Sequence, residues 1–495
     1  MSFAKIYTRG LLGLHAPLIE VEVHVSQGLP ALTIVGLAEA AVRESKDRVR
    51  SAIINSGFVF PTKRLTINLA PADLPKDGSR LDLPIALGIL IASGQLPEQV
   101  TDAFEFIGEL ALDGHLRPVT GTLSIAMACQ AAQHQLLLPQ ENSEEAAQLP
   151  ELKVFAASHL KQVCEHFLNL HKITATSKPE VAAQKSYKFD LADVKGQLRP
   201  RRALEIAAAG GHSILFKGPP GTGKTLLASR LPSILPPLTA QENLEVASIY
   251  SVANTQHSFG QRPFRAPHHT ASAIALVGGG SHPKPGEITL AHFGILFLDE
   301  LPEFDRKVLE VLRQPLESKE IVISRASRQV TFPANFQLVA AMNPCPCGYA
   351  FNQDHRCQCS AEAIKRYRNR ISGPLLDRID LHIDVPPLKA QELQDPKPVE
   401  NSETVRTRVI QAYQVQIQRQ GYLNHGLAPQ PLERYAELDS ASQKMLELAQ
   451  QRLNLSARGY HRILRVARTI ADLAQSTEIQ SLHLSEALSY RRNEN

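Results

Sequence analysis

The chain has 495 residues, enough for about three domains with cores of their own. Its formal net charge of +4 is mildly basic, which permits binding to nucleic acid without arguing for it. Four of its six cysteines cluster between Cys345 and Cys359, which argues against a disulfide scaffold. The N-terminus has no signal-peptide pattern, and the longest apolar run, residues 83–92, is about half of a membrane span, so we expect a cytoplasmic protein without a membrane partner.

Residues 1–172 mix strand and helix patterns, and we predict an α+β domain there. Alternating or apolar runs predict strands at 19–25, 64–69 and 135–139, and helical spacing predicts helices at 39–54, 81–93 and 123–133. Residues 104–114 are predicted to form a hairpin whose turn is Asp113-Gly114.

Part of this domain resembles Lon-type proteases. Residues 77–86 are similar to the segment that carries the nucleophile in that family, and residues 108–121 are similar to the hairpin and helix start that follow it. The family's Ser–Lys dyad would then fall at Arg80 and Ile125, which cannot act because nucleophilic catalysis needs an activatable hydroxyl and a neighbouring base. Ser79 lies one position away, so a displaced dyad is the alternative. We therefore expect a Lon-like fold without peptidase activity, used for assembly or substrate contact.

A phosphate-binding loop follows a polar linker at 173–188. Residues 213–216 read as a strand, and the next residues fit the pattern G-x-x-x-x-G-K-[ST] before a helical segment. Backbone N–H groups at such a helix N-terminus cradle phosphates, Lys224 would reach the β- and γ-phosphates, and Thr225 would ligate Mg²⁺. The predicted nucleotide-binding residues are Gly218, Pro219, Pro220, Gly221, Thr222, Gly223, Lys224 and Thr225.

Two further apolar stretches end in polar side chains. Residues 294–298 run into Asp299 and Glu300, and residues 336–342 run into Asn343. Ligands collect at the carboxyl ends of buried parallel strands, so we expect Asp299 to hold Mg²⁺ and Glu300 to polarise the attacking water. Asn343 either contacts the γ-phosphate or the water, or only begins an Asn-Pro turn.

Four cysteines lie in one short stretch: Cys345, Cys347, Cys357 and Cys359. Four thiols this close together in a reducing compartment are typical of a tetrahedral Zn²⁺ site. The C-x-C spacing is tighter than the usual C-x₂₋₄-C, so free thiols that only pack are the alternative.

The residues that follow the predicted strand at 336–342 carry a more specific resemblance. Residues 341–344 are similar to the corresponding run in magnesium-chelatase-like AAA+ proteins, which implies the sensor 1 role for Asn343. Residues 373–381 resemble the segment of chelatase and MCM ATPases that supplies an arginine finger to the neighbouring subunit, which implies that role for Arg378. Arg370 is a second candidate, and a surface salt bridge is the alternative for Arg378.

The C-terminal part is predicted to be a helical lid. Periodicity predicts helices at 404–418 and 440–453, and Ser456 is a predicted N-cap for a helix at 457–473. That helix resembles an AAA+ lid helix, with Arg458 at the sensor 2 position, from which it would reach the γ-phosphate. A solvent-exposed basic face is the alternative.

Two basic segments are candidate DNA contacts. Residues 319–332 predict a β-hairpin with Arg325 and Arg328 near its tip, and they resemble the insertion before sensor 1 that chelatases share with MCM helicases. In a ring this hairpin would project into the pore, where basic side chains grip phosphates, although a solvated basic turn is the alternative. Residues 262–270, with Arg265, are a second pore-loop candidate. Their adjacent histidines could bind metal, but no partnering Cys or Glu pattern lies nearby.

Taken together, the chain resembles the ComM/YifB family of magnesium-chelatase-like AAA+ ATPases. The implied fold is α/β, an AAA+ P-loop parallel sheet (residues 189–390) with a helical lid (391–495), preceded by the α+β Lon-like domain. The resemblance implies a homo-hexameric DNA motor that uses ATP and Mg²⁺ to promote branch migration of single-stranded or branched DNA in homologous recombination and natural transformation. The alternatives are a chelatase-type motor that remodels a partner protein and an ATP-dependent protease.

Overall fold

The computed structural model describes residues 3–76, 78–98, 103–177, 187, 189–280, 283–325, 328–350, 356–388, 399–453 and 455–491. These residues form two compact units, one of residues 1–183 with 244–257 and the other of residues 184–243 with 258–495. Most of the predicted linker at 173–188, and the predicted boundary at residue 390, lie outside the described residues. Within the described ranges, no helix is long and apolar enough to cross a membrane.

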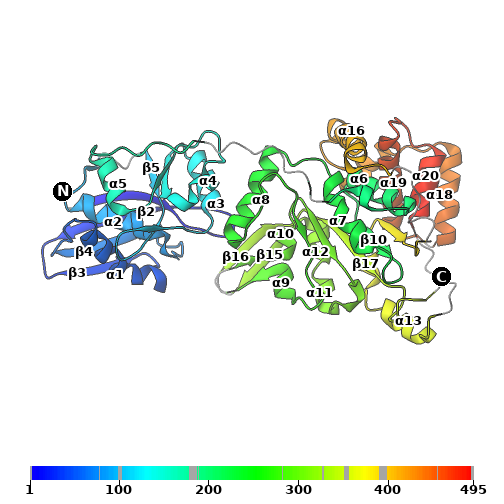
Figure 1. The fold of residues 1–495 in the computed structure, drawn as a ribbon, viewed down its shortest axis with the longest axis horizontal. Coiled ribbons are helices and arrows are strands. Elements are labelled where there is room, and N and C mark those ends of the chain that lie inside the picture. Colours follow the sequence, from blue (N-terminus) through cyan, green and yellow to red (C-terminus); the bar gives the residue numbers. More distant parts are fainter. Residues whose placement is uncertain are drawn as a thin grey trace. The chain divides into compact units, whose positions relative to one another are not determined.

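A mixed sheet organises the first unit (Figure 1). Among the described residues it has seven strands in the order β3-β4-β2-β1-β5-β8-β9. The β1–β2 and β2–β4 pairs are antiparallel, and the other neighbours are parallel. The strands are β1 (Phe3–Arg9), β2 (Leu18–Ser26), β3 (Ala31–Val35), β4 (Arg64–Ala70), β5 (Phe104–Phe106), β8 (Gln135–Pro139) and β9 (Val154–Ala157).

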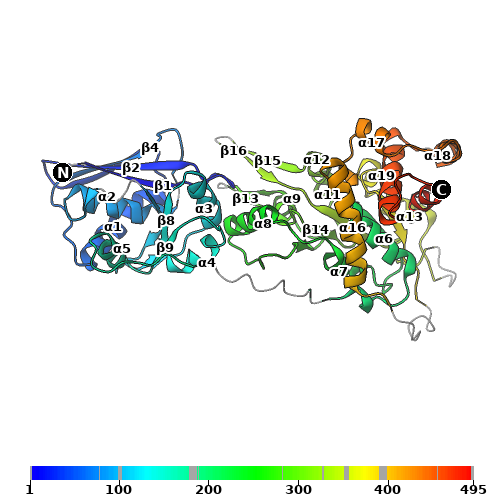
Figure 2. The same cartoon turned by 90° about the horizontal axis from the view of Figure 1, so that it is seen from above.

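Helices cover this sheet because the apolar residues of its inner strands need a partner. Alternate residues of β2 and β4, such as Val23 and Ile67, are fully buried. Helix α2 packs on β1 and β2, and α1 packs on α2 (Figure 2). Every residue of α2 is buried, which explains why the residues after its first, Asp82, are all apolar or glycine. The helices are α1 (Ala40–Asn55), α2 (Asp82–Ala92), α3 (Thr122–Ala131), α4 (Ser143–Ala146) and α5 (Leu160–Phe167).

The predicted hairpin at 104–114 is wrong in its pairing. Residues 104–106 form β5, which pairs in parallel with β1 and β8 instead of folding back on the next strand. The hairpin lies one step later, between β6 (Glu109–Leu110) and β7 (Leu116–Arg117), and the Asp113-Gly114 pair lies in its loop. The turn at Asp113-Gly114 is confirmed, but a local sequence pattern cannot show that residues 104–106 pair in parallel with strands far away in the sequence.

A parallel sheet forms the centre of the second unit. In the described part of the chain it has five strands, in the order β11-β14-β17-β10-β18, and all neighbours are parallel. Each residue of β10 and β14 is buried, as expected for strands covered on both faces. The strands are β10 (Ile214–Lys217), β11 (Phe264–Arg265), β14 (Ile295–Leu298), β17 (Gln337–Met342) and β18 (Leu381–Asp384).

Shorter elements surround this sheet. A separate antiparallel hairpin, β15 (Glu320–Arg325) and β16 (Arg328–Pro333), extends away from the lid in Figure 2. Two-residue strands β12 (Gly278–Gly279) and β13 (Lys284–Pro285) pair with each other. The helices are α6 (Leu198–Gly210), α7 (Lys224–Ile234), α9 (Ala273–Val277), α10 (Glu287–Leu290), α11 (Arg306–Glu310), α12 (Arg313–Ser318), α13 (Ala361–Arg368) and α14 (Gly373–Leu376). Most of helix α8 (Ala240–Ala253) belongs to the first unit, which includes residues 244–257.

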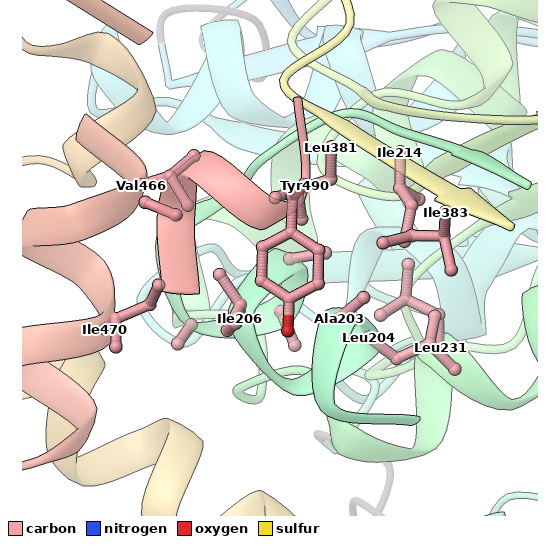
Figure 3. Packing of buried hydrophobic residues seen from close by; sticks show 14 of the residues in the cluster. Ala203, Leu204, Ile206, Ile214, Leu231, Leu381, Ile383, Val466, Ile470 and Tyr490 are labelled. Carbon is pink, nitrogen blue, oxygen red and sulfur yellow. The ribbon is translucent and has the colours of Figure 1, made fainter. Parts of the chain in front are cut away.

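The C-terminal residues form the predicted helical lid. Its helices are α16 (Ser402–Gln420), α17 (Pro429–Tyr435), α18 (Ser440–Leu453), α19 (Ala457–Leu473) and α20 (Ser481–Ser489). As predicted, Ser456 caps α19, its Oγ accepting from the Gly459 N–H at 3.1 Å. Figure 3 shows Val466 and Ile470 of α19 packed with Ile206 of α6 and with Ile214 and Ile383 of the sheet. One hydrophobic core therefore joins the sheet to its lid, and the predicted α/β architecture is confirmed.

We predict that Arg468→Met lowers the free energy of unfolding of the second unit by about 3 kcal/mol, because it breaks a buried charge pair. Arg468 is 2% exposed, and its guanidinium donates to Asp472 at 3.1 Å and to the Thr477 carbonyl at 2.8 Å. Chemical denaturation measures the change. The exposed Arg452 of α18, changed to Met in a control, should shift the midpoint little, and equal effects of the two exchanges would contradict the assignment.

Candidate nucleotide site

The predicted phosphate-binding loop joins the end of β10 to the start of α7. Its glycines are required by geometry, because a Cβ on Gly218 would lie 2.2 Å from the Val385 carbonyl oxygen. Gly221 and Gly223 have φ values of +76° and +85°, in the left-handed region that favours glycine. Helix α7 begins at Lys224, so its N-terminus faces the loop, which is the arrangement that binds phosphate.

Lys224 ties this loop to the neighbouring strand. Its Nζ donates to the carbonyls of Gly218 and Pro219, both at 2.8 Å, and to Asn343 Oδ1 at 3.1 Å. Burial lowers the pKa of Lys224, and the nearby carboxylates of Asp299 and Glu300 oppose that shift. The ammonium group of Lys224 therefore lies at the phosphate-binding loop, where the phosphates of a nucleotide would bring negative charge.

Asp299 and Glu300 follow β14 directly, as predicted. Thr225 Oγ1 donates to Asp299 Oδ2 at 2.6 Å, so the two predicted Mg²⁺ ligands lie side by side. Glu300 has φ +51°, uncommon for a residue with a Cβ, and its side chain is 53% exposed. An outward-facing, backbone-strained carboxylate beside a phosphate loop is suited to activating a water molecule.

His269 contacts this carboxylate, which we did not predict. Its Nδ1 lies 3.4 Å from Glu300 Oε2. No local sequence pattern reveals this contact, because it follows from the register of β11 on β14, which pairs Phe264 with Ile295 and brings the residues after both strands to the same edge. A groove of about 1170 Å³ opens beside His269, and its rim carries Arg306, Lys307, Lys365, Arg366 and Arg370.

The residues at this edge fit a magnesium nucleotide. The donor set is a threonine hydroxyl and a carboxylate, the oxygen ligands that Mg²⁺ prefers, next to a glycine cradle for the phosphates. Residues from β10, β14 and β17 converge there because these three strands are parallel neighbours, with Lys217 opposite Met342 and Leu298 opposite Ala340.

The predicted arginines do not join this group of contacts. Arg378 donates to Glu317 Oε1 at 2.6 Å, its side chain is only 7% exposed, and Arg458 approaches the same oxygen at 3.7 Å. Arg370 donates to Glu303 Oε2 at 2.9 Å, and Glu303 lies three residues after Glu300. The structure therefore brings the arginine-finger and sensor 2 candidates together on one glutamate of α12.

The predicted DNA contacts differ in their surroundings. Arg325 is the last residue of β15 and Arg328 the first of β16; they pair across the hairpin tip, and nothing is described of their side chains. Arg265 forms a bidentate ion pair with Glu287, both contacts at 2.7 Å. His268 accepts from or donates to Thr270 Oγ1 at 2.9 Å. Neither histidine belongs to a group of three or more potential ligands among the described residues.

The four cysteines form such a group. Their sulfur atoms all lie within 4.8 Å of one another. Cys345 Sγ is 3.3 Å from Cys347 Sγ and 3.7 Å from Cys357 Sγ, and the remaining pair of these three is 3.6 Å apart. Four thiolates around one Zn²⁺ at about 2.3 Å give sulfur–sulfur edges of about 3.8 Å, so the arrangement fits that ion.

The positions of the Lon-type dyad hold no catalytic pair. Arg80 is buried, and Ile125 lies in the apolar core around α3. Ser79 donates to the Glu109 carboxylate. A serine bound to a carboxylate, with isoleucine at the position of the base, offers no support for peptidase chemistry in the first unit.

Comparison with known proteins covers nearly the whole chain. Models of magnesium chelatase subunit ChlI match residues 190–393 and 21–142, and a model of its C-terminal part matches residues 399–491. The chain is 49% identical to "Competence protein ComM" of Haemophilus influenzae, over 99% of this chain and 98% of the relative. It is also 49% identical to YifB of Salmonella typhimurium, over 99% and 97%. A partial match to Lon protease 2 of Bacillus subtilis is 26% identical over 36% of this chain and 37% of that protein.

We predict that Glu300→Gln slows ATP turnover by about 10²–10⁴-fold, because the amide cannot accept a proton from the attacking water. Binding of a fluorescent ATP analogue should be unchanged, since the phosphate loop is intact. The same exchange at Glu310 in α11, which pairs with Arg313 at the surface, is the control and should leave turnover unaffected. Equal rates for wild type and Glu300→Gln would remove Glu300 from the reaction.

Proposed function

Because the chain belongs to the ComM/YifB family of magnesium-chelatase-like AAA+ proteins, we propose that it is an ATP-driven DNA motor, a hexameric translocase or helicase that promotes branch migration. Its cofactors are ATP and Mg²⁺, with Zn²⁺ at the cysteine cluster. Its partners are single-stranded or branched DNA and further copies of the chain. The name of the Haemophilus relative, a competence protein, supports a role in recombination during natural transformation.

The observation that carries the ATPase part is the convergence of five side chains at one sheet edge: Lys224, Thr225, Asp299, Glu300 and Asn343. Lys224 and the loop N–H groups bind phosphate, and Glu300 accepts a proton from the water that Asn343 helps to orient. Mg²⁺, when bound, neutralises charge on the phosphates.

The proposal that a neighbouring subunit completes the site rests on the arginines. Arg378 and Arg458 are paired with Glu317, whereas the phosphate-loop residues contact one another and Asn343. Positive charge that stabilises the transferring phosphoryl group then comes from the neighbouring subunit, as in other ATPases with arginine fingers. A head-to-tail interface of this kind closes into a ring. Arg370, held at Glu303 beside its own Glu300, is the second candidate.

The DNA part rests on the hairpin β15–β16. It is a two-stranded projection outside the core sheet, and its tip carries Arg325 and Arg328. Basic side chains on a projecting hairpin suit the phosphate backbone, and their contribution falls as salt rises because bound counterions are released. Arg265 is a weaker candidate for this role, since Glu287 already neutralises its guanidinium group.

We predict that DNA stimulates ATP turnover and that the double variant Arg325→Ala, Arg328→Ala loses this stimulation, because two phosphate contacts per subunit disappear. Steady-state ATPase assays with and without single-stranded and forked DNA, at low and raised salt, measure the effect. Removing the exposed lid arginines Arg434 and Arg452 is the matched control. Turnover that DNA never changes, together with no binding to forked substrates, would overturn the proposed function.

We predict that Arg378→Ala and Lys224→Ala are each inactive alone but regain turnover when mixed. The Lys224→Ala subunit still offers Arg378 to a neighbour whose phosphate loop is intact. Subunit exchange followed by an ATPase assay tests this. Absence of recovery after exchange has been verified would place Arg378 in its own subunit's site or outside catalysis.

A second candidate is a chelatase-type motor that remodels a partner protein. It is favoured by the three chelatase-subunit matches, which together cover most of the chain. The two candidates share the ATPase site and differ in what stimulates it, so the DNA-stimulation assay separates them. An ATP-dependent protease is not favoured, because Arg80 and Ile125 occupy the dyad positions.

A further inference from the structure

The cysteine cluster lies next to the nucleotide site in sequence and in space. Cys345 comes two residues after Asn343, at the end of β17, and is fully buried. Its backbone carbonyl accepts from the Gly348 N–H at 3.0 Å, and its Sγ accepts from the Ala350 N–H at 3.2 Å. These bonds curl the chain tightly around the first two cysteines.

This curl rests against the phosphate-binding loop. Gly348 has φ +87°, and a Cβ there would lie 2.5 Å from Pro220 Cδ. The backbone of the cysteine loop therefore touches a residue of the P-loop so closely that a side chain would not fit. In addition, the Gly218 N–H donates to the Met342 carbonyl at 3.2 Å, so the P-loop and the end of β17 are joined on both sides of Asn343.

The residues after the cysteines also contact Asn343. Helix α13 begins at Ala361, two residues after Cys359, and carries the buried Tyr367. A hydrogen bond links the Tyr367 hydroxyl to the backbone of Asn343, and burial raises the pKa of this tyrosine, so its hydroxyl stays protonated. Asn343 is thus contacted from the described residues on both sides of the cysteine cluster, 343–350 and 356–367.

The distances between the sulfur atoms indicate what kind of group the four cysteines hold. Separations of 3.3–3.7 Å are too long for a disulfide bond, which needs about 2.05 Å. Sulfur atoms packed this closely also leave no room for an iron–sulfur cube between them. Four cysteine sulfur atoms at the spacing of a tetrahedron are the donor set of a structural Zn²⁺ site.

We propose that a Zn²⁺ ion bound by Cys345, Cys347, Cys357 and Cys359 fixes Asn343 against the P-loop, so that binding and hydrolysis of ATP depend on zinc. This inference rests on the proposed ATPase site and assigns the metal a positioning role in it. The ion joins the residues on both sides of the cluster that contact Asn343 and presses Gly348 onto Pro220. Because Asn343 faces the γ-phosphate position, the effect is larger for ATP than for ADP.

The first measurement is the metal content of the purified full-length chain, by elemental analysis after dialysis against a chelator. We expect one zinc ion per chain in wild type and in Cys164→Ser, which changes a buried thiol of the first unit, and loss of zinc in Cys357→Ser. Should Cys357→Ser fail to fold, Co²⁺ loaded into wild type gives the absorption bands of tetrahedral thiolate coordination. Wild type without zinc and without these Co²⁺ bands, or zinc retained in Cys357→Ser, would overturn the site.

The second measurement compares ATP and ADP affinities of zinc-loaded and zinc-free chain by fluorescence titration. We expect zinc removal to weaken ATP binding by about tenfold or more, the worth of one hydrogen bond to a charged group, and ADP binding less. In Asn343→Ala, removal of zinc should add little, because the side chain that the ion positions is already gone. Unchanged ATP affinity without zinc would overturn the positioning role. A zinc-loaded chain that binds no nucleotide would instead count against the proposed function.

Discussion

The hydrogen bond between Lys224 Nζ and Asn343 Oδ1 is the contact on which the site depends. It exists because β10 and β17 are adjacent and parallel, so the residues that follow them emerge at the same edge. Strand β14 adds Asp299 and Glu300 by the same rule. Because carbonyl oxygens hold Lys224 and Thr225 holds Asp299, these side chains are preorganised for a nucleotide.

The parts that the sequence predicted well are those determined by short-range pattern. The short apolar run 214–216 and the glycine pattern after it predict the P-loop, and apolar runs that end at Asp299 and Asn343 predict the other two strand ends of the site. The lid helices at 440–453 and 457–473 were placed at their observed bounds, because amphipathic spacing and the Ser456 cap are local signals. These patterns do not predict the order of the strands, and the resemblance to AAA+ proteins implied only a parallel sheet; the order is known from the structure.

The parts that escaped prediction depend on contacts between residues far apart in sequence. His269 meets Glu300 because β11 is the edge strand beside β14, which no local pattern states. Arg378 and Arg458, 80 residues apart, share Glu317, so the surface salt bridge considered for Arg378 does form in the isolated chain. The Arg458 side chain is 64% exposed and its contact with Glu317 is long, at 3.7 Å, so this contact is weak and can give way to a stronger anion.

We propose that ATP hydrolysis at this site moves a DNA branch point. The most direct measurement is branch migration of a synthetic four-way junction by the purified chain with Mg²⁺ and ATP, compared with ADP, with no nucleotide and with the Glu300→Gln variant. We expect the product strands of the junction to appear only when the wild-type chain hydrolyses ATP. Active ATP turnover with no movement of the junction, or equal movement in the absence of ATP, would contradict it.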